Sequence, residues 1–179
     1  MLRTTIIEEI TSIDGIPKYL AKRVQRECLM VRDKYDEICV EYNNNQELSV
    51  TFKNKYNQYS FYLSKPYPFV PPRVTVDKLS QNELFHIRTK RFQTILKYIS
   101  GLDCLCCHSY LCRNNWSPTV PLSKVISQID EYRNIKKNIA LKIIIDQIKL
   151  KYLNRYIDLD SWVFTISLPR LCDPDKIIL

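Results

Sequence analysis

The chain has 179 residues, of which 45% are hydrophobic and 26% charged, and this ordinary globular composition excludes an intrinsically disordered chain. A formal net charge of +8 invites a nucleic-acid interpretation. The Lys and Arg residues are nevertheless spread along the sequence among acids and match no known nucleic-acid motif, so we expect no nucleic-acid partner.

The sequence also predicts a cytoplasmic protein. No apolar run reaches membrane-spanning length, and the first residues carry acids where a signal peptide has its apolar stretch, so we expect no membrane partner. The abundance of Ile, Lys, Asn and Tyr with only two glycines is typical of an AT-rich genome, such as that of a large DNA virus or a protist. For a viral protein, the predicted compartment is the host cytoplasm.

The first half of the chain predicts one helix followed by an antiparallel meander. Apolar residues recur at helical spacing over residues 18–35. Alternating stretches follow at residues 37–42, 47–53, 58–63 and 73–77, and the first three are separated by Asn-rich turns. The pattern therefore predicts an α+β fold with an N-terminal helix, a four-stranded antiparallel meander sheet and C-terminal helices.

A proline-rich link precedes the fourth strand. Pro66, Pro68, Pro71 and Pro72 fix their backbone angles and remove ladder donors, which predicts an extended, unpaired segment. Within it we expect Tyr67 and Phe69 to act as apolar pegs.

The second half of the chain predicts helices. The pattern of Phe92, Ile95, Leu96 and Ile99 predicts an additional helix over residues 88–100. Ser123 can cap a helix that carries Leu122 and Val125, and a separate, longer helical pattern runs over residues 135–156. The tail over residues 162–166 and 169–179 is apolar and unclassified, and no linker or repeat marks a second domain, so we expect one domain over residues 1–179.

Seven cysteines, an odd number, predict reduced thiols, a metal or catalysis rather than structural disulfides. Four of them lie close together, at Cys104, Cys106, Cys107 and Cys112. The Cys104-x-x-Cys107 spacing is that of metal ligands, and His108, Cys112 or His86 would complete a zinc site. The alternative interpretation is packing of small apolar thiols. We expect His86 to pack rather than to take part in catalysis.

Two motifs together resemble the core of ubiquitin-conjugating enzymes. The segment Tyr67-Pro68-Phe69-Val70-Pro71-Pro72 is similar to that family's Tyr-Pro-Phe-x-Pro-Pro, and Cys107 lies nine residues before Trp116, which opens a Trp-x-Pro sequence. The resemblance covers about residues 18–133, and residues 134–179 would be a helical C-terminal extension.

The resemblance implies an enzyme that carries ubiquitin or a ubiquitin-like modifier as a cysteine thioester and needs no metal or other cofactor. Cys107 is the best match to the nucleophile, because Tyr110 and Leu111 supply the apolar pair that follows it in the family. Cys106 and Cys104 remain alternatives. Trp116 would be a structural wedge that fixes the cysteine loop.

The resemblance also implies partners: an activating enzyme, a RING-type ligase and the modifier itself. The positions that match the family's docking surfaces are Lys22, Arg23, Arg26, Phe69, Ser117 and Pro118.

One departure from the family concerns catalysis. The chain has no His-Pro-Asn motif before the cysteine, and in the family its asparagine stabilises the oxyanion formed when lysine attacks the thioester. Asn114, Asn115 or a backbone amide would have to replace it. The rival hypothesis is a catalytically inactive ubiquitin-conjugating-like scaffold or binding module, with zinc stabilisation as a further option.

Overall fold

The computed structural model describes residues 2–4, 10, 15–42, 47–87 and 89–151. Within these ranges the chain is an α+β protein, as expected. Six strands form one antiparallel sheet in which each strand pairs with the next along the chain, in the order β1 to β6. The predicted apolar tail lies outside the described residues.

The four predicted strands are β2 (Glu37–Tyr42), β3 (Leu48–Lys53), β4 (Gln58–Leu63) and β5 (Arg73–Val76). The expected number of four is too low, because two short strands extend the meander at its edges. These are β1 (Leu2–Thr4), which pairs with β2, and β6 (Leu79–Ser80), which pairs with β5. Runs of three and two residues are too short for an alternating hydrophobic pattern to reveal.

One face of the sheet forms the core because the strand register aligns the apolar residues. Val50 is opposite both Val40 and Phe61, and Phe61 is opposite Val74. These side chains are buried, and the rings of Phe52 and Phe61 meet edge to face with centroids 5.9 Å apart. A slip by one residue would turn this row to the other face, so the hydrophobic pattern fixes the register.

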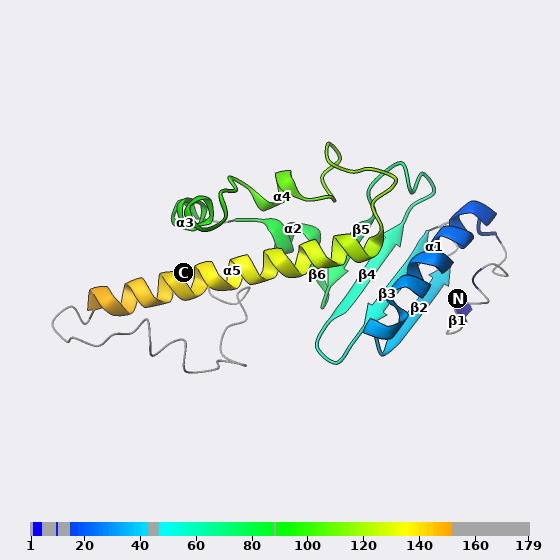
Figure 1. Ribbon diagram of the computed structural model, residues 1–179, viewed down its shortest axis with the longest axis horizontal. Coiled ribbons are helices and arrows are strands. Elements are labelled where there is room, and N and C mark those ends of the chain that lie inside the picture. The colour runs from blue at the N-terminus through cyan, green and yellow to red at the C-terminus, as the bar shows by residue number, and fades with distance from the viewer. Residues whose placement is uncertain (1, 5–9, 11–14, 43–46, 88, 152–179) are drawn as a thin grey trace. The chain divides into compact units, whose positions relative to one another are not determined.

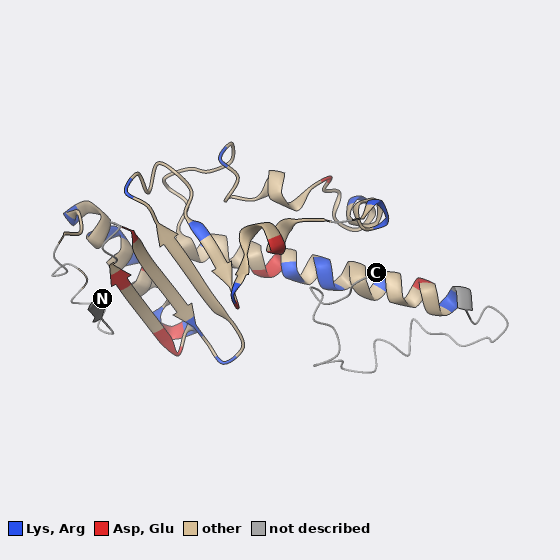
Figure 2. Cartoon of the chain, turned by 180° about the vertical axis from the view of Figure 1, so that it is seen from behind, with Lys and Arg blue, Asp and Glu red and all other residues tan. Residues whose placement is uncertain are grey.

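Helix α1 (Lys18–Val31) covers this sheet over β2 and β3, as the two opposite views show (Figures 1 and 2). It buries Leu20, Val24, Cys28 and Val31, which recur at helical spacing. The predicted helix was longer, because its last turn is a separate 3-10 helix, η2 (Arg32–Lys34), after which Tyr35 is extended and packs its ring 5.4 Å from that of Phe52.

The proline link behaves as expected at Tyr67 and differently at Phe69. Tyr67 is almost completely buried, whereas 76% of Phe69 is exposed. In an extended chain side chains alternate in direction, so residues 67 and 69 would lie on the same side. Two local turns, Tyr67 N–H to the Ser64 oxygen and Phe69 N–H to the Pro66 oxygen, break that alternation and turn Phe69 outward.

Helix α2 (Gln81–Phe85) was not predicted, although its signal is in the sequence. Ser80 accepts a hydrogen bond from the Glu83 N–H, and the Glu83 carboxylate accepts one from the Ser80 N–H at 2.7 Å. This arrangement is a capping box, and the sequence pattern Ser-x-x-Glu is typical of it. His86 follows as the C-cap of α2 and is exposed, so the expectation that His86 packs is wrong.

The additional helix is confirmed as α3 (Lys90–Ser100). Its N-cap Thr89 accepts from the Phe92 N–H, and its C-cap Gly101 has the left-handed conformation, with φ 71°.

The two expected C-terminal helices are one continuous helix, α5 (Leu122–Lys151). The separation is wrong because residues 133–135, Arg-Asn-Ile, contain no glycine or proline that would end a helix. The helix also begins one residue before Ser123, since Pro121 accepts from the N–H groups of Lys124 and Val125.

By its internal contacts the chain forms two compact units. The first comprises Met1–His86 and Cys106–Ile129, and the second comprises Ile87–Leu105 and the chain from Asp130 onward. The sheet, α1 and the segment from Cys106 to the first turns of α5 therefore belong to one unit.

None of the helices in the described ranges is long and apolar enough to cross a membrane. Lys and Arg are spread over α1, the ends of the strands, α3 and α5 (Figure 2).

Candidate functional site: an exposed cysteine pair

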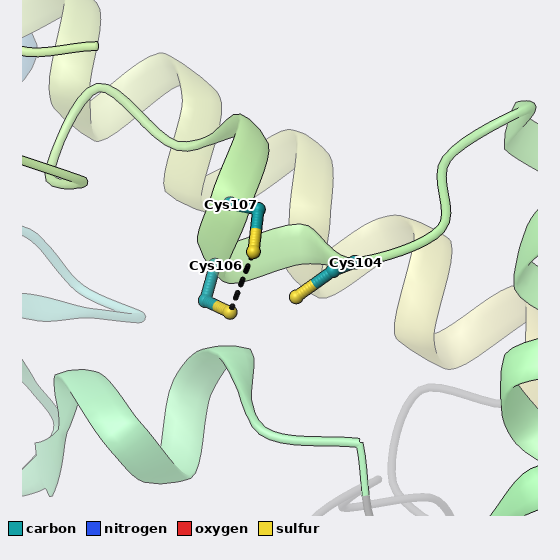
Figure 3. A group of neighbouring side chains, drawn as sticks. All are labelled: Cys104, Cys106 and Cys107. Carbon is teal, nitrogen blue, oxygen red and sulfur yellow. Dashed lines mark hydrogen bonds between the residues drawn. The ribbon is translucent and has the colours of Figure 1, made fainter. Parts of the chain in front are cut away.

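The predicted nucleophiles lie around α4 (Leu105–His108), a single helical turn. Leu105 is fully buried and anchors this turn, while Cys106 and Cys107 are exposed and Cys104 is half-buried. The Sγ atoms of Cys106 and Cys107 are 3.8 Å apart, and the three thiols of the stretch point toward one another (Figure 3). All three Sγ atoms lie within 4.8 Å of each other. The stretch thus presents several nucleophilic sulfurs at the surface.

Two amide side chains hold the segment that follows. Gln128 of α5 accepts at Oε1 from the Tyr110 N–H (2.8 Å) and from the Ser109 hydroxyl (3.2 Å), and its Nε2 donates to the His108 oxygen at 3.3 Å. Asn115 donates from Nδ2 to the main-chain oxygens of Cys107 (2.6 Å) and Ser109 (3.3 Å). The main chain at Cys107 is therefore fixed although its side chain is exposed.

Trp116 connects this cysteine loop to the proline link. Its indole Nε1 donates to the main-chain oxygen of Pro68 at 2.7 Å, and its ring lies 6.1 Å from the ring of Tyr67. The two motifs that carry the family resemblance are therefore in direct contact, although 48 residues separate Pro68 from Trp116.

The buried carboxylate of Glu27 links α1, the proline link and the start of α5 by hydrogen bonds. Glu27 of α1 accepts from Arg23 Nε (2.8 Å), from the Tyr67 hydroxyl (3.3 Å) and from the Leu122 N–H at the start of α5 (2.8 Å). A carboxylate at a helix N-terminus also stabilises the helix dipole. Arg23 completes the cluster: it lies over the Tyr67 ring and donates to the oxygens of Pro118 and Val120.

Burial raises the pKa of Tyr67 in this cluster and of Cys28, which follows Glu27 in α1. Desolvation, with a smaller contribution from the neighbouring Glu27 charge, raises the pKa of the Cys28 thiol to about 12. The same two causes raise the pKa of Tyr67 well above its usual range. Cys28 is therefore a neutral packing thiol at physiological pH.

The residues matched to docking surfaces differ in exposure. Lys22, Arg26 and Phe69 are exposed, and Ser117 and Pro118 are half-buried. The Ser117 hydroxyl is 2.8 Å from that of Thr119. Arg23 is half-buried and its guanidinium is held by Glu27, Pro118 and Val120, which gives it an internal role that the sequence pattern did not reveal.

The apolar pair after Cys107 is only partly buried. Leu111 lies in the core, whereas Tyr110 is half-buried and carries the Lys124 ammonium 5.1 Å from its ring centre. Of the two asparagines named as oxyanion donors, Asn114 is exposed and Asn115 is engaged with main-chain oxygens.

The residues that could hold a metal ion differ from the zinc ligands expected from the sequence. Within the described residues, the thiol group that could hold a metal contains Cys104, Cys106 and Cys107, and it does not include His86, His108 or Cys112. The Cys104-x-x-Cys107 spacing names two of these three residues, and Cys106 was not included because adjacent cysteines are not a standard ligand spacing.

Comparisons of this chain with protein-family models, with curated proteins and with solved structures found no match.

Proposed function

We propose that this chain is a divergent ubiquitin-conjugating enzyme with that family's fold, which carries ubiquitin or a ubiquitin-like modifier on Cys107 and transfers it to a lysine. The observation that carries the proposal is the hydrogen bond from Trp116 to Pro68 at 2.7 Å, because it brings together the two motifs on which the resemblance rests. A chance similarity of two short motifs gives no reason for them to meet.

The chemistry requires an accessible thiolate on a fixed main chain. The Cys107 sulfur attacks the activated C-terminal carbonyl of the modifier, a sulfur–carbon bond forms and the activating enzyme's leaving group departs. A lysine amine then attacks the thioester carbon, an isopeptide bond replaces the sulfur–carbon bond, and Cys107 leaves as a thiolate while the amine gives up its proton. Exposure of Cys107 allows both attacks, and the Asn115 bond to its carbonyl holds the main chain that carries the sulfur.

Docking of the activating enzyme and a RING-type ligase is part of the proposal. Lys22 and Arg26 offer exposed positive charge on α1, and Phe69 offers an exposed aromatic ring beside the Trp116–Pro68 contact. An exposed aromatic side chain with basic neighbours is a common anchor in protein interfaces.

Because the chain lacks the asparagine of His-Pro-Asn, we expect a low rate of transfer from the thioester to lysine. Loss of one oxyanion donor costs about a hundredfold to a thousandfold in the rate of acyl transfer. Asn115 already donates to two main-chain oxygens, so we assign it a positioning role, and we expect lysine transfer to be slow compared with thioester formation.

The engagement of Asn115 also favours a second candidate, a non-catalytic scaffold that binds the modifier or a ligase without forming a thioester.

The test is a thioester assay with activating enzyme, ATP and ubiquitin, run with and without reductant on the wild type and on Cys104→Ser, Cys106→Ser and Cys107→Ser. We expect a reducible adduct that is lost only in Cys107→Ser. An adduct lost only in another variant would move the nucleophile to that cysteine. Absence of any adduct with ubiquitin and with a panel of ubiquitin-like modifiers and their activating enzymes would reject catalysis in favour of the scaffold.

A further inference from the structure

The sulfurs of Cys104, Cys106 and Cys107 have the spacing of ligands around one metal ion. Two thiolates bound at 2.3 Å to a tetrahedral zinc ion are about 3.8 Å apart. The Cys106 and Cys107 sulfurs already have this separation, 3.8 Å. The other two pairs lie within 4.8 Å, so an adjustment of about 1 Å or less in each pair would complete the set.

The local chain explains why three sulfurs gather here. The three cysteines belong to four consecutive residues, and the fourth residue, Leu105, is fully buried. With Leu105 held in the interior, the side chains on either side of it face outward, and the helical turn of α4 brings them together (Figure 3). The cluster is therefore set by the backbone of one short stretch.

We propose that Cys104, Cys106 and Cys107 bind one thiophilic metal ion, Zn²⁺, as three thiolates. A set that consists only of thiolates selects soft or borderline ions and excludes Mg²⁺ and Ca²⁺, which require oxygen ligands. Three protein ligands leave the fourth tetrahedral position for water or an exogenous ligand. The exposure of Cys106 and Cys107 gives the ion a path of entry.

This inference goes beyond the proposed function and does not depend on it. The two are linked through Cys107, because a thiolate that coordinates Zn²⁺ is not available to form a thioester. Zinc loading is therefore expected to suppress thioester formation reversibly, and a chelator is expected to restore it.

The experiment uses the untagged 179-residue chain, reduced and freed of metal. Zn²⁺ binding is measured by competition with a chromophoric chelator, and Co²⁺ is used as a spectroscopic probe, since sulfur-to-cobalt charge-transfer bands report thiolate ligation. We expect one ion per chain, with these bands present. Cys104→Ser, Cys106→Ser and Cys107→Ser should each weaken Zn²⁺ binding by about a hundredfold, because each removes one of the three zinc ligands.

Cys112→Ser is the matched control, since Cys112 is a half-buried cysteine close in sequence and outside the thiol group. It should leave zinc affinity unchanged. Absence of charge-transfer bands, a stoichiometry that does not reach one, or equal weakening by Cys112→Ser would overturn the proposal. Circular dichroism of each variant shows whether it folds, and protection of the three thiols from alkylation by Zn²⁺ in the wild type provides a readout that needs no substitution.

The two proposals fail separately. Zinc binding without any thioester supports the metal site and rejects catalysis. A thioester on Cys107 without zinc binding does the reverse.

Discussion

The indole N–H of Trp116 donates to the main-chain oxygen of Pro68, and this single bond joins the cysteine loop to the proline link. The Pro68 carbonyl lies between β4 and β5, in a proline-rich segment outside the strands, and the indole N–H provides it with a side-chain donor. The position of Trp116 is thus determined by a polar contact as well as by its ring.

Trp116→Phe should destabilise the protein by about 1 to 2 kcal/mol, since an aromatic ring remains, although a smaller one, and the Pro68 oxygen loses its donor. The free energy of unfolding in urea measures this. Phe69→Ala is the control, because Phe69 is 76% exposed and its truncation should change stability by about 0.5 kcal/mol or less. Equal stability of Trp116→Phe and the wild type would show that the hydrogen bond contributes nothing net.

Glu27→Ala should cost about 3 kcal/mol or more, because it leaves Arg23, the Tyr67 hydroxyl and the Leu122 N–H without their common acceptor. Glu27→Gln, which retains one acceptor oxygen, should cost less. Glu37→Ala is a suitable comparison: Glu37 pairs with Lys53 at an exposed position, and its loss should cost about 1 kcal/mol at most. If the two alanine variants were equally stable, the buried cluster would have no special role.

Asn115→Ala should loosen the main chain at Cys107, whereas Asn114→Ala should not, since Asn114 is an exposed neighbour of the same type. We expect a stability loss of about 1 kcal/mol for Asn115→Ala. A second readout is the alkylation rate of Cys107 in the folded protein, which should change only in Asn115→Ala. Identical rates in the two variants would contradict the positioning role.

Stability should decline at alkaline pH in part because of Cys28. The Cys28 thiol has its ordinary pKa of 9.0 in the unfolded chain and a pKa of about 12 when folded, so the unfolded state releases its proton first. The contribution of Cys28 is fully present below pH 9.0 and is lost as pH rises toward 12, by up to about 1.4 kcal/mol per pH unit.

The comparison of wild type with Cys28→Ala isolates this effect from that of other groups. Urea unfolding between about pH 8 and pH 10.5, under reducing conditions, should give a shallower decline of stability for Cys28→Ala above pH 9.0. Parallel pH profiles would mean that Cys28 titrates alike in both states.

Local signals were sufficient to predict most of the fold from the sequence. The alternation at Gln58–Leu63 and the Asn-rich turns predicted the meander, and the helical spacing of apolar residues predicted α1 and α3. The division of α5 failed because its apolar residues were interpreted as two separate helical patterns, although residues 133–135 contain no glycine or proline that would end a helix.

The candidate site was only partly predictable, for a physical reason. Adjacent cysteines and a tryptophan at a suitable spacing are visible in the sequence, so Cys107, Cys106 and Trp116 could be named as candidates. The roles of Gln128 and Glu27 depend on partners far away in the chain, such as Tyr110 and Leu122, and no periodicity reports such contacts. Arg23 was assigned to a docking surface for the same reason: its charge was visible and its internal partners were not.

The Glu27 cluster also limits how this chain can diverge. A change at Arg23, Glu27 or Tyr67 alone leaves a buried charge or hydroxyl without its partner, so viable sequences should change these positions jointly or not at all. The combination of Arg and Glu one helical turn apart with the tyrosine of the proline link is therefore a signature by which distant relatives could be sought, even where the cysteines themselves have been replaced.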